Sequence, residues 1–268
     1  MVFGISTKVL RDFSLEEAIT IVETCGYEAI ELWMDDLLTS GLPAEKIVQM
    51  TDRSGLQRTV HLLTEDLNIA SFNAGIRRES LKQQKEGIRR AADIGARSVT
   101  LHPGRKSAKA RNLEEAWKCQ IDSINELAIA AEECGVTLCV EAMEKIAGEF
   151  VLTPYDLSRV INGCASSNLA VTLDISHLQT VGDVNQLLRE AEGIPVGNIH
   201  ISQSYCGKPH LPLYAQEGEI DYLEVFHILG SYYDKTVILE GYIPNAGLEI
   251  AEHGVQWYKN TIKALEVV

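Results

Sequence analysis

Short apolar runs recur along the whole chain and alternate with longer segments in which apolar residues return every three or four positions. Short apolar runs are typical of buried strands, and the longer spacing is typical of helices that pack by one face. Their alternation indicates βαβ units and a parallel sheet. The runs predict strands at residues 2–6, 29–33, 58–62, 98–102, 137–141, 169–174, 197–201 and 236–240, with helices in the intervals.

Glycines mark several of the joints between predicted helices and strands. Gly26, Gly95 and Gly135 each stand shortly before a strand-like run. Glycine adopts the left-handed conformation that ends a helix without steric cost, so it allows the chain to reverse into the next strand. The same unit, a helix followed by glycine and a short apolar strand, therefore repeats along the chain.

Helix starts are marked as well. Ser14 and Glu17 have the spacing of a capping box, and Pro43 and Pro154 stand at early helical positions. Eight strands in strict alternation with eight helices favour a single (β/α)8 TIM barrel over an open doubly wound sheet, and about 250 residues are typical of that fold. No linker-like segment divides the chain, so we expect one TIM-barrel domain over residues 1–268.

The charge of the chain bears on its partners. The 268 residues carry a formal net charge of -14, and only two short basic clusters occur, Arg77-Arg78 and Arg105-Lys106. Nucleic-acid affinity comes largely from Lys and Arg that neutralise phosphates, so the charge argues against a nucleic-acid partner. No apolar stretch approaches the roughly 20 residues of a membrane span, and no basic leader region precedes the first strand. We therefore expect no membrane partner and a cytoplasmic location.

Metal-capable side chains stand where several predicted strands end, namely His102, Glu141, Asp174, His200 and Glu240. The carboxyl ends of barrel strands meet at one rim, so we expect these side chains to converge. The last four supply three carboxylates and one imidazole, a mostly hard set that suits Mn²⁺, Mg²⁺ or Co²⁺ and also accommodates Zn²⁺. The sequence therefore predicts a divalent metal site at this rim.

Further histidines are expected around that site. His61 ends a predicted strand, His177 follows Asp174 by three residues, and His210 lies in the loop after the seventh strand. Together with His102 they form a second tier that serves either as substrate contacts or as further metal ligands. Taken alone, His61 or His102 is also compatible with a histidine at the edge of the core, and His177 with a surface histidine in a loop. The remaining two histidines are expected on helix surfaces.

At these residues the chain resembles the xylose isomerase-like TIM barrels, a superfamily that includes AP endonuclease family 2. The resemblance spans most of the chain, and the order and spacing of short segments carry it. The segments are Val60-His61, Leu67-Asn-Ile-Ala-Ser71, Leu101-His-Pro-Gly104, Val140-Glu141, Leu173-Asp-Ile-Ser-His177, Asn198-Ile-His200, His210-Leu-Pro-Leu213, Glu217-Gly-Glu-Ile-Asp221 and Leu239-Glu240.

The resemblance implies a metal-dependent isomerase or epimerase of a sugar, sugar acid or sugar phosphate. In such enzymes the metal polarises the substrate carbonyl and lowers the pKa of the neighbouring C–H group. Glu141 and Glu240 would exchange the proton through a cis-enediolate, and His177 would hold a substrate oxygen that gains charge. Barrels of this kind often pair, which leaves a homo-oligomer open. The implied metal ligands are Glu141, Asp174, His200 and Glu240. The implied substrate contacts are His61, His102, His177 and His210.

The same superfamily implies an alternative. Endonuclease IV-like enzymes hold three zinc ions and hydrolyse a phosphodiester of abasic DNA, with additional ligands that resemble the same four histidines. The chain departs from their pattern at Lys208, where an Asp is expected two residues before the loop histidine, and at Gln203, where Asp is common. These departures and the acidic net charge favour a small carbohydrate substrate. A non-catalytic binding protein on this scaffold also stays open, because a fold does not dictate a function.

Overall fold

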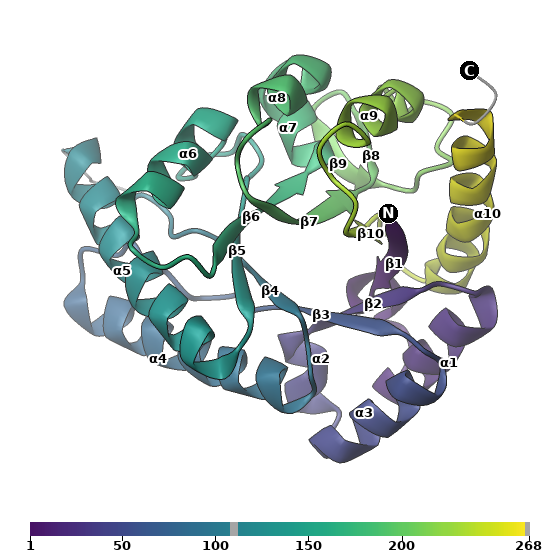
Figure 1. Cartoon of the computed structure of the whole chain (residues 1–268), viewed down its shortest axis with the longest axis horizontal. Coiled ribbons are helices and arrows are strands. Elements are labelled where there is room, and N and C mark those ends of the chain that lie inside the picture. The colour runs from purple at the N-terminus through teal and green to yellow at the C-terminus, as the bar shows by residue number, and fades with distance from the viewer. Residues whose placement is uncertain (108–111, 266–268) are drawn as a thin grey trace.

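A closed ring of eight parallel strands lies at the centre of the computed structural model, and helices surround it (Figure 1). The structure describes residues 1–107 and 112–265. The ring runs in the order β1-β10-β7-β6-β5-β4-β3-β2 and closes through the pairing of β2 with β1. This arrangement confirms the predicted (β/α)8 TIM barrel. The strands are β1 (Val2–Ser6), β2 (Ala29–Trp33), β3 (Gln57–His61), β4 (Ser98–Leu101), β5 (Thr137–Glu141), β6 (Leu169–Asp174), β7 (Val196–Ile201) and β10 (Thr236–Leu239).

The helices form the outer layer and begin and end largely where their sequence signals stand. Ser14 and Glu17 make the predicted capping box, and Pro154 is the first residue of its helix. Pro43 lies one position earlier than expected, as the N-cap. The helices are α1 (Leu15–Cys25), α2 (Met34–Thr39), α3 (Ala44–Arg53), α4 (Ala74–Asp93), α5 (Leu113–Cys134), α6 (Pro154–Gly163), α7 (Ile175–Val181), α8 (Val184–Glu190), α9 (Tyr222–Leu229) and α10 (Gly247–Leu265).

The prediction that one helix alternates strictly with one strand was wrong at three places. Two helices lie between β2 and β3, because Gly41 adopts a positive φ and Pro43 cannot continue a helix. Two more lie between β6 and β7, where an extended Gly182 separates α7 from α8. After β7 the chain forms an antiparallel hairpin of β8 (Gln203–Tyr205) and β9 (Lys208–Leu211) before α9. A short 3-10 helix, η1 (Thr7–Leu10), follows β1.

The barrel interior contains a polar layer. Thr100 on β4 contacts Thr172 on β6 at 3.0 Å between their hydroxyl oxygens, although β5 separates these strands in the ring. Asn198 on β7 reaches Thr100 at 3.3 Å. Such contacts cross the interior, so these side chains point inward. Side chains alternate along a strand, so the residue two positions further on faces the same interior, closer to the carboxyl-terminal rim. The residues at those positions are His102, Asp174 and His200.

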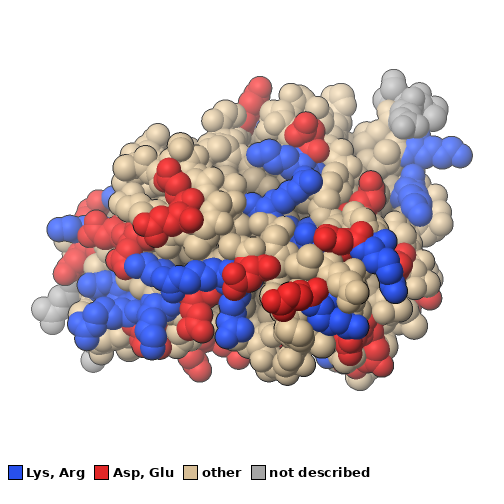
Figure 2. Space-filling view, turned by 60° about the horizontal axis from the view of Figure 1, so that its bottom comes forward, with Lys and Arg blue, Asp and Glu red and all other residues tan. Residues whose placement is uncertain are grey.

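The space between the strands and the helices is apolar. Ile30, Leu32, Val60 and Val99 are completely buried in one continuous hydrophobic cluster that includes residues of the surrounding helices. On the face that Figure 2 shows, Lys and Arg side chains are interspersed with Asp and Glu. Among the described residues, no helix combines the length and the apolar character that crossing a bilayer requires.

Candidate functional site

All eight side chains that the sequence nominated lie at or beside the carboxyl-terminal rim of the barrel. His61, Glu141 and Asp174 are the last residues of their strands, and His200 is the last but one. The other four are His102 directly after β4, His177 in α7, His210 in β9 and Glu240 directly after β10. Within the described residues these eight form three overlapping groups in which potential ligand atoms lie within 4.8 Å of one another.

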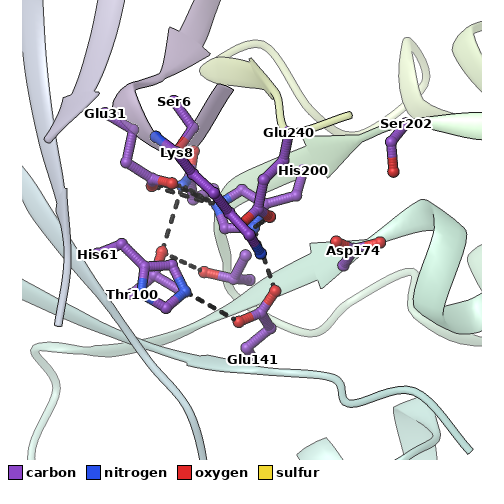
Figure 3. A network of polar contacts seen from close by, with 12 residues as sticks. Ser6, Lys8, Glu31, His61, Thr100, Glu141, Asp174, His200, Ser202 and Glu240 are labelled. Atoms are coloured by element: carbon purple, nitrogen blue, oxygen red, sulfur yellow. Dashed lines mark hydrogen bonds and ion pairs between the residues drawn. The ribbon is translucent and has the colours of Figure 1, made fainter. Parts of the chain in front are cut away.

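The central group contains Glu141, Asp174, His200 and Glu240, whose ligand atoms lie within 4.8 Å of one another (Figure 3). All four residues are at most 2% exposed. They lie at or directly after the ends of four strands that are consecutive in the ring, β5, β6, β7 and β10. The predicted convergence of these residues is therefore present in the fold.

Asp174 keeps one carboxylate oxygen free of hydrogen bonds. Its Oδ1 accepts hydrogen bonds from the Ser176 hydroxyl and from the backbone N–H of His177, both at 2.8 Å. Oδ2 is buried and has no hydrogen-bond partner. The carboxylate caps α7 with one oxygen and so presents the other to the cluster.

His200 lies between the two glutamates of the group. Its Nδ1 lies 3.1 Å from Oε1 of Glu141 and 2.9 Å from Oε2 of Glu240. Burial lowers the pKa of His200, but the carboxylates of Glu31, Glu240 and Glu141 outweigh burial and raise the pKa well above its usual value. Without a metal ion, the imidazole is therefore held as a cation among carboxylates.

Glu141 also contacts two histidines of the second tier. Its Oε2 lies 3.0 Å from Nε2 of His102 and 3.5 Å from Nε2 of His61. Burial raises the pKa of Glu141, but His102 and His200 outweigh burial and bring the pKa well below its usual value. The ring of His61 stacks on Trp33 with 4.3 Å between centroids, which fixes its orientation.

His177 and His210 face each other at 3.0 Å between their Nε2 atoms. Nδ1 of His177 donates to the carbonyl of Ala142 at 2.9 Å, because a carbonyl can only accept. Nδ1 of His210 is buried and has no hydrogen-bond partner, and burial lowers the pKa of His210 to about 4. His210 is thus a neutral imidazole, and it forms a group with Asp174 and His177 in which potential ligand atoms lie within 4.8 Å of one another.

Two residues of the site, Lys8 and Glu31, were not predicted from the sequence. Lys8, in η1, donates to Oε1 of Glu240 at 3.1 Å. Burial lowers the pKa of Lys8, but attraction to Glu240 and to the other carboxylates outweighs burial and raises it. Glu31, inside β2, contacts the opposite edge of the His200 ring (Figure 3). A charged residue inside the apolar run 29–33 was a signal that could have revealed Glu31, whereas nothing local marks Lys8.

Lys208 and Gln203, the two residues that depart from the endonuclease pattern, lie in different environments. Lys208 is exposed on β9. Gln203 is buried and joins the hairpin to the chain before α9, since its Nε2 donates to the Ile220 carbonyl at 2.9 Å and its Oε1 accepts from the Ile220 N–H at 3.1 Å. Asp174, His177 and His210 form a three-residue group without Lys208.

The residues present fit a divalent cation. Three carboxylates and an imidazole make a donor set of the correct number and chemistry for a four-ligand site. Oδ2 of Asp174 is the clearest single indication, because a buried carboxylate oxygen without a hydrogen bond is costly unless a cation balances it. Nε2 of His177 lies 3.7 Å from this oxygen. The group around Glu141, His61 and His102 offers a second set of three donors.

Comparison with known proteins gives relatives over most of the chain. It is 26% identical over 244 residues to an uncharacterized protein of Methanocaldococcus jannaschii, a match that covers 90% of this chain and 83% of that one. It is 24% identical over 222 residues to an L-ribulose 3-epimerase of Mesorhizobium japonicum, with 80% and 71% covered.

Solved structures share the fold. A D-tagatose 3-epimerase-like protein matches with a TM-score of 0.88 and 23% identity, over 99% of this chain and 98% of that one. The IOLI protein with a bound zinc atom matches with a TM-score of 0.81 and 18% identity, over the same shares of the two chains. A family model described as a xylose isomerase-like TIM barrel matches residues 19–261. Because that match spans nearly the whole barrel, the chain belongs to the xylose isomerase-like TIM barrel family.

Proposed function

We propose that this protein is a divalent-metal-dependent isomerase or epimerase that acts on a small carbohydrate, either a sugar, a sugar acid or a sugar phosphate. The observation that carries the proposal is the placement of two buried carboxylates, Glu141 and Glu240, 3.1 Å and 2.9 Å from the same ring nitrogen of His200. Two carboxylates beside one candidate cation site match a reaction in which one base removes a proton from a carbon and the other returns it, either to the opposite face of that carbon (epimerase) or to the neighbouring carbon (isomerase).

Glu141, Asp174, His200 and Glu240 would hold the ion. A bound divalent cation would polarise the substrate carbonyl and acidify the neighbouring C–H group. Candidates are Mn²⁺, Mg²⁺, Co²⁺ and Zn²⁺, since the set is rich in oxygen but includes an imidazole. The solved structure of the IOLI protein with zinc supports the inclusion of zinc in this group.

The two glutamates would transfer the proton. The depressed pKa of each keeps both ionised near neutral pH, so either can accept a proton from the substrate carbon. They approach from β5 and from the end of β10, with β6 and β7 between them in the ring. This separation suits removal of the proton by one carboxylate and its return by the other. Burial excludes water, which would otherwise compete for the proton.

The second-tier histidines would bind the substrate. His177 is fixed through its Nδ1 by the Ala142 carbonyl, so its Nε2 can be aimed at a substrate oxygen. His61, His102 and His210 would contact other hydroxyl groups around the cluster. The relatives named L-ribulose 3-epimerase and D-tagatose 3-epimerase-like protein make ketoses the first substrates to examine.

The test is hydrogen exchange at the substrate carbon. The protein is loaded with Mn²⁺, mixed with a panel of ketoses in D₂O, and deuterium at carbons beside the carbonyl is followed by NMR. We expect exchange in the wild type and a loss of about 10²-fold or more in Glu240→Gln and Glu141→Gln. His253→Gln, which replaces an exposed histidine of α10, is the control. Retained exchange in Glu240→Gln would remove that residue from proton transfer.

A zinc-dependent phosphodiesterase that acts on abasic DNA is the second candidate. It is favoured by the two additional three-residue groups, one with His61 and His102 and one with His177 and His210. Metal analysis separates the two candidates, because three zinc ions per chain together with cleavage of abasic-site DNA would favour the phosphodiesterase. One ion per chain without cleavage would favour the carbohydrate enzyme.

A further inference from the structure

Glu31 is a fully buried carboxylate inside the barrel, in the middle of β2 (Figure 3). Its Oε1 and Oε2 lie 3.1 Å and 3.2 Å from Nε2 of His200. Oε2 also accepts hydrogen bonds from Asn198 Nδ2 at 2.9 Å and from the Thr59 hydroxyl at 3.3 Å. The carboxylate is thus held by donors from two other strands while both oxygens face one edge of the imidazole.

The opposite edge of that imidazole faces the candidate metal ligands. Nδ1 of His200 contacts Glu141 and Glu240, whereas Nε2 contacts Glu31. Glu31 does not belong to any of the potential ligand groups found among the described residues. The ring of His200 therefore lies between Glu31 and the candidate ligands Glu141 and Glu240, and it is the member of the cluster that Glu31 contacts.

Other neighbours do not offer Nε2 an equivalent acceptor. The side-chain amide nitrogen of Asn198 is 3.2 Å from Nε2, but it is a donor that already serves Glu31. The amide oxygen of Asn198 accepts from the Thr236 hydroxyl at 2.9 Å. Within the described structure, the Glu31 carboxylate is thus the acceptor that the ring edge meets.

We propose that Glu31 is a positioning residue, which accepts the Nε2–H of His200 and thereby leaves Nδ1, on the side of Glu141 and Glu240, as the nitrogen that binds a divalent ion. In the metal-free protein carboxylates lie at both ring nitrogens. A cation bound among Glu141, Asp174 and Glu240 would take the lone pair of Nδ1, so the single N–H of the neutral ring would then be on Nε2, where the Glu31 carboxylate accepts it. Carboxylates behind metal-binding histidines act in this way, and losing one typically weakens metal affinity by about 10- to 100-fold. This inference rests on the proposed metal-dependent function.

The cost of burying the Glu31 carboxylate also favours a role in orienting His200. Burying a carboxylate costs several kcal/mol, and a barrel interior can be filled by apolar side chains. Neighbouring positions of β2, Ile30 and Leu32, are apolar and completely buried. A charge at residue 31 therefore needs a reason beyond filling space, and orientation of His200 supplies one.

The experiment compares wild type, Glu31→Gln and Thr59→Val. Glutamine keeps the shape of Glu31 but removes its charge, whereas Thr59→Val removes the longest hydrogen bond to Oε2 and leaves the contact with His200. Zn²⁺ affinity of the metal-free proteins is measured by calorimetry. Protein labelled with ¹⁵N-histidine and loaded with Zn²⁺ is examined by NMR to assign the nitrogen that carries hydrogen in His200.

We expect Glu31→Gln to bind Zn²⁺ about 10- to 100-fold more weakly and to lose the uniform Nε2–H signature, with Thr59→Val close to wild type. Wild-type affinity and an unchanged signature in Glu31→Gln would overturn the inference and leave the proposed function intact. A lower melting temperature with unchanged affinity would assign Glu31 a purely structural role and would also overturn it.

A wild type that binds no divalent ion would overturn the proposed function and this inference together. If Glu31→Gln does not fold, Glu31→Asp replaces it, since aspartate keeps the charge but withdraws the oxygens from the ring. We then expect weakened Zn²⁺ binding with the Nε2–H signature retained. Wild-type affinity in a folded Glu31→Asp would count against the positioning role.

Discussion

Lys8 donates to Oε1 of Glu240 over 3.1 Å, and this contact joins the segment after the first barrel strand to the residue directly after the last. The Lys8 ammonium also lies 4.7 Å from the centre of the Trp33 ring. The other oxygen of Glu240 contacts His200 at 2.9 Å. A permanent cation is therefore built into the carboxylate cluster that we propose to bind a divalent ion.

Replacing Lys8 should strengthen metal binding. A unit positive charge hydrogen-bonded to a ligand of a divalent ion repels that ion by several kcal/mol even at an effective dielectric constant of about 20. We expect Lys8→Met to bind Mn²⁺ at least about tenfold more tightly, as measured by calorimetry. Lys8→Arg keeps the charge and should retain the wild-type affinity. Equal or weaker binding in folded Lys8→Met would mean that orienting Glu240 matters more than repulsion.

Metal should stabilise the fold only when the cluster is intact. A ligand present at 100 times its dissociation constant stabilises the native state by about 2.7 kcal/mol. We expect Mn²⁺ to raise the melting temperature of the wild type and of the surface variant His253→Gln, but not of Glu141→Gln. Differential scanning calorimetry with and without EDTA is the measurement. An equal rise in Glu141→Gln would place the binding site elsewhere.

Acid should destabilise the metal-free protein partly through His210. Burial lowers its pKa to about 4, whereas an unfolded histidine titrates near 6.5. Between these values the unfolded state binds more protons, so the stability that His210 contributes is present above about pH 6.5 and is lost as pH falls towards 4. The full loss from this group is about 3 kcal/mol.

Urea unfolding in EDTA at several pH values checks this effect. His210→Gln should show a shallower fall in unfolding free energy between pH 6.5 and pH 4 than the wild type. His227→Gln, which changes an exposed histidine of α9, serves as the control. Parallel curves for His210→Gln and wild type would show that His210 does not cause the acid sensitivity.

Gly104 should not tolerate a side chain. An added Cβ would lie 2.2 Å from the backbone nitrogen of Ala70 and 2.5 Å from its Cβ, so the backbone around His102 would have to move. We expect Gly104→Ala to lose about 3 kcal/mol or more of unfolding free energy and to weaken metal binding. At Gly182 the nearest atom would be 3.9 Å away and the backbone is extended, so Gly182→Ala is the matched control. Similar stabilities of the two variants would contradict this reading.

The sequence predicted both ends of all eight barrel strands to within one residue, because buried strands are short apolar runs with glycine at their joints. It did not predict the division of helices at Gly41 and Gly182 or the hairpin after β7. Those segments are short and partly polar, so periodicity does not distinguish them from loops. The expected domain of residues 1–268 remains a prediction.

The candidate ligands could be chosen from sequence because a charged or imidazole side chain at the end of an apolar run is conspicuous. Glu141, Asp174, His200 and Glu240 stand at such places, and strand order alone brings them to one rim. The sequence by itself thus determined the barrel and the identity of the central cluster. The roles of these four residues in binding and catalysis remain proposals.

Only the tertiary structure decided which polar groups surround that cluster. Lys8 and Glu240 are far apart in the chain, and Glu31 meets His200 across the barrel interior. The contact between Lys8 and Glu240 forms because ring closure pairs β1 with β10. The contact between Glu31 and His200 forms because both side chains point into the barrel, from β2 and from β7. Local patterns report which way a side chain faces, but which groups meet depends on distances that exist only after the barrel has closed.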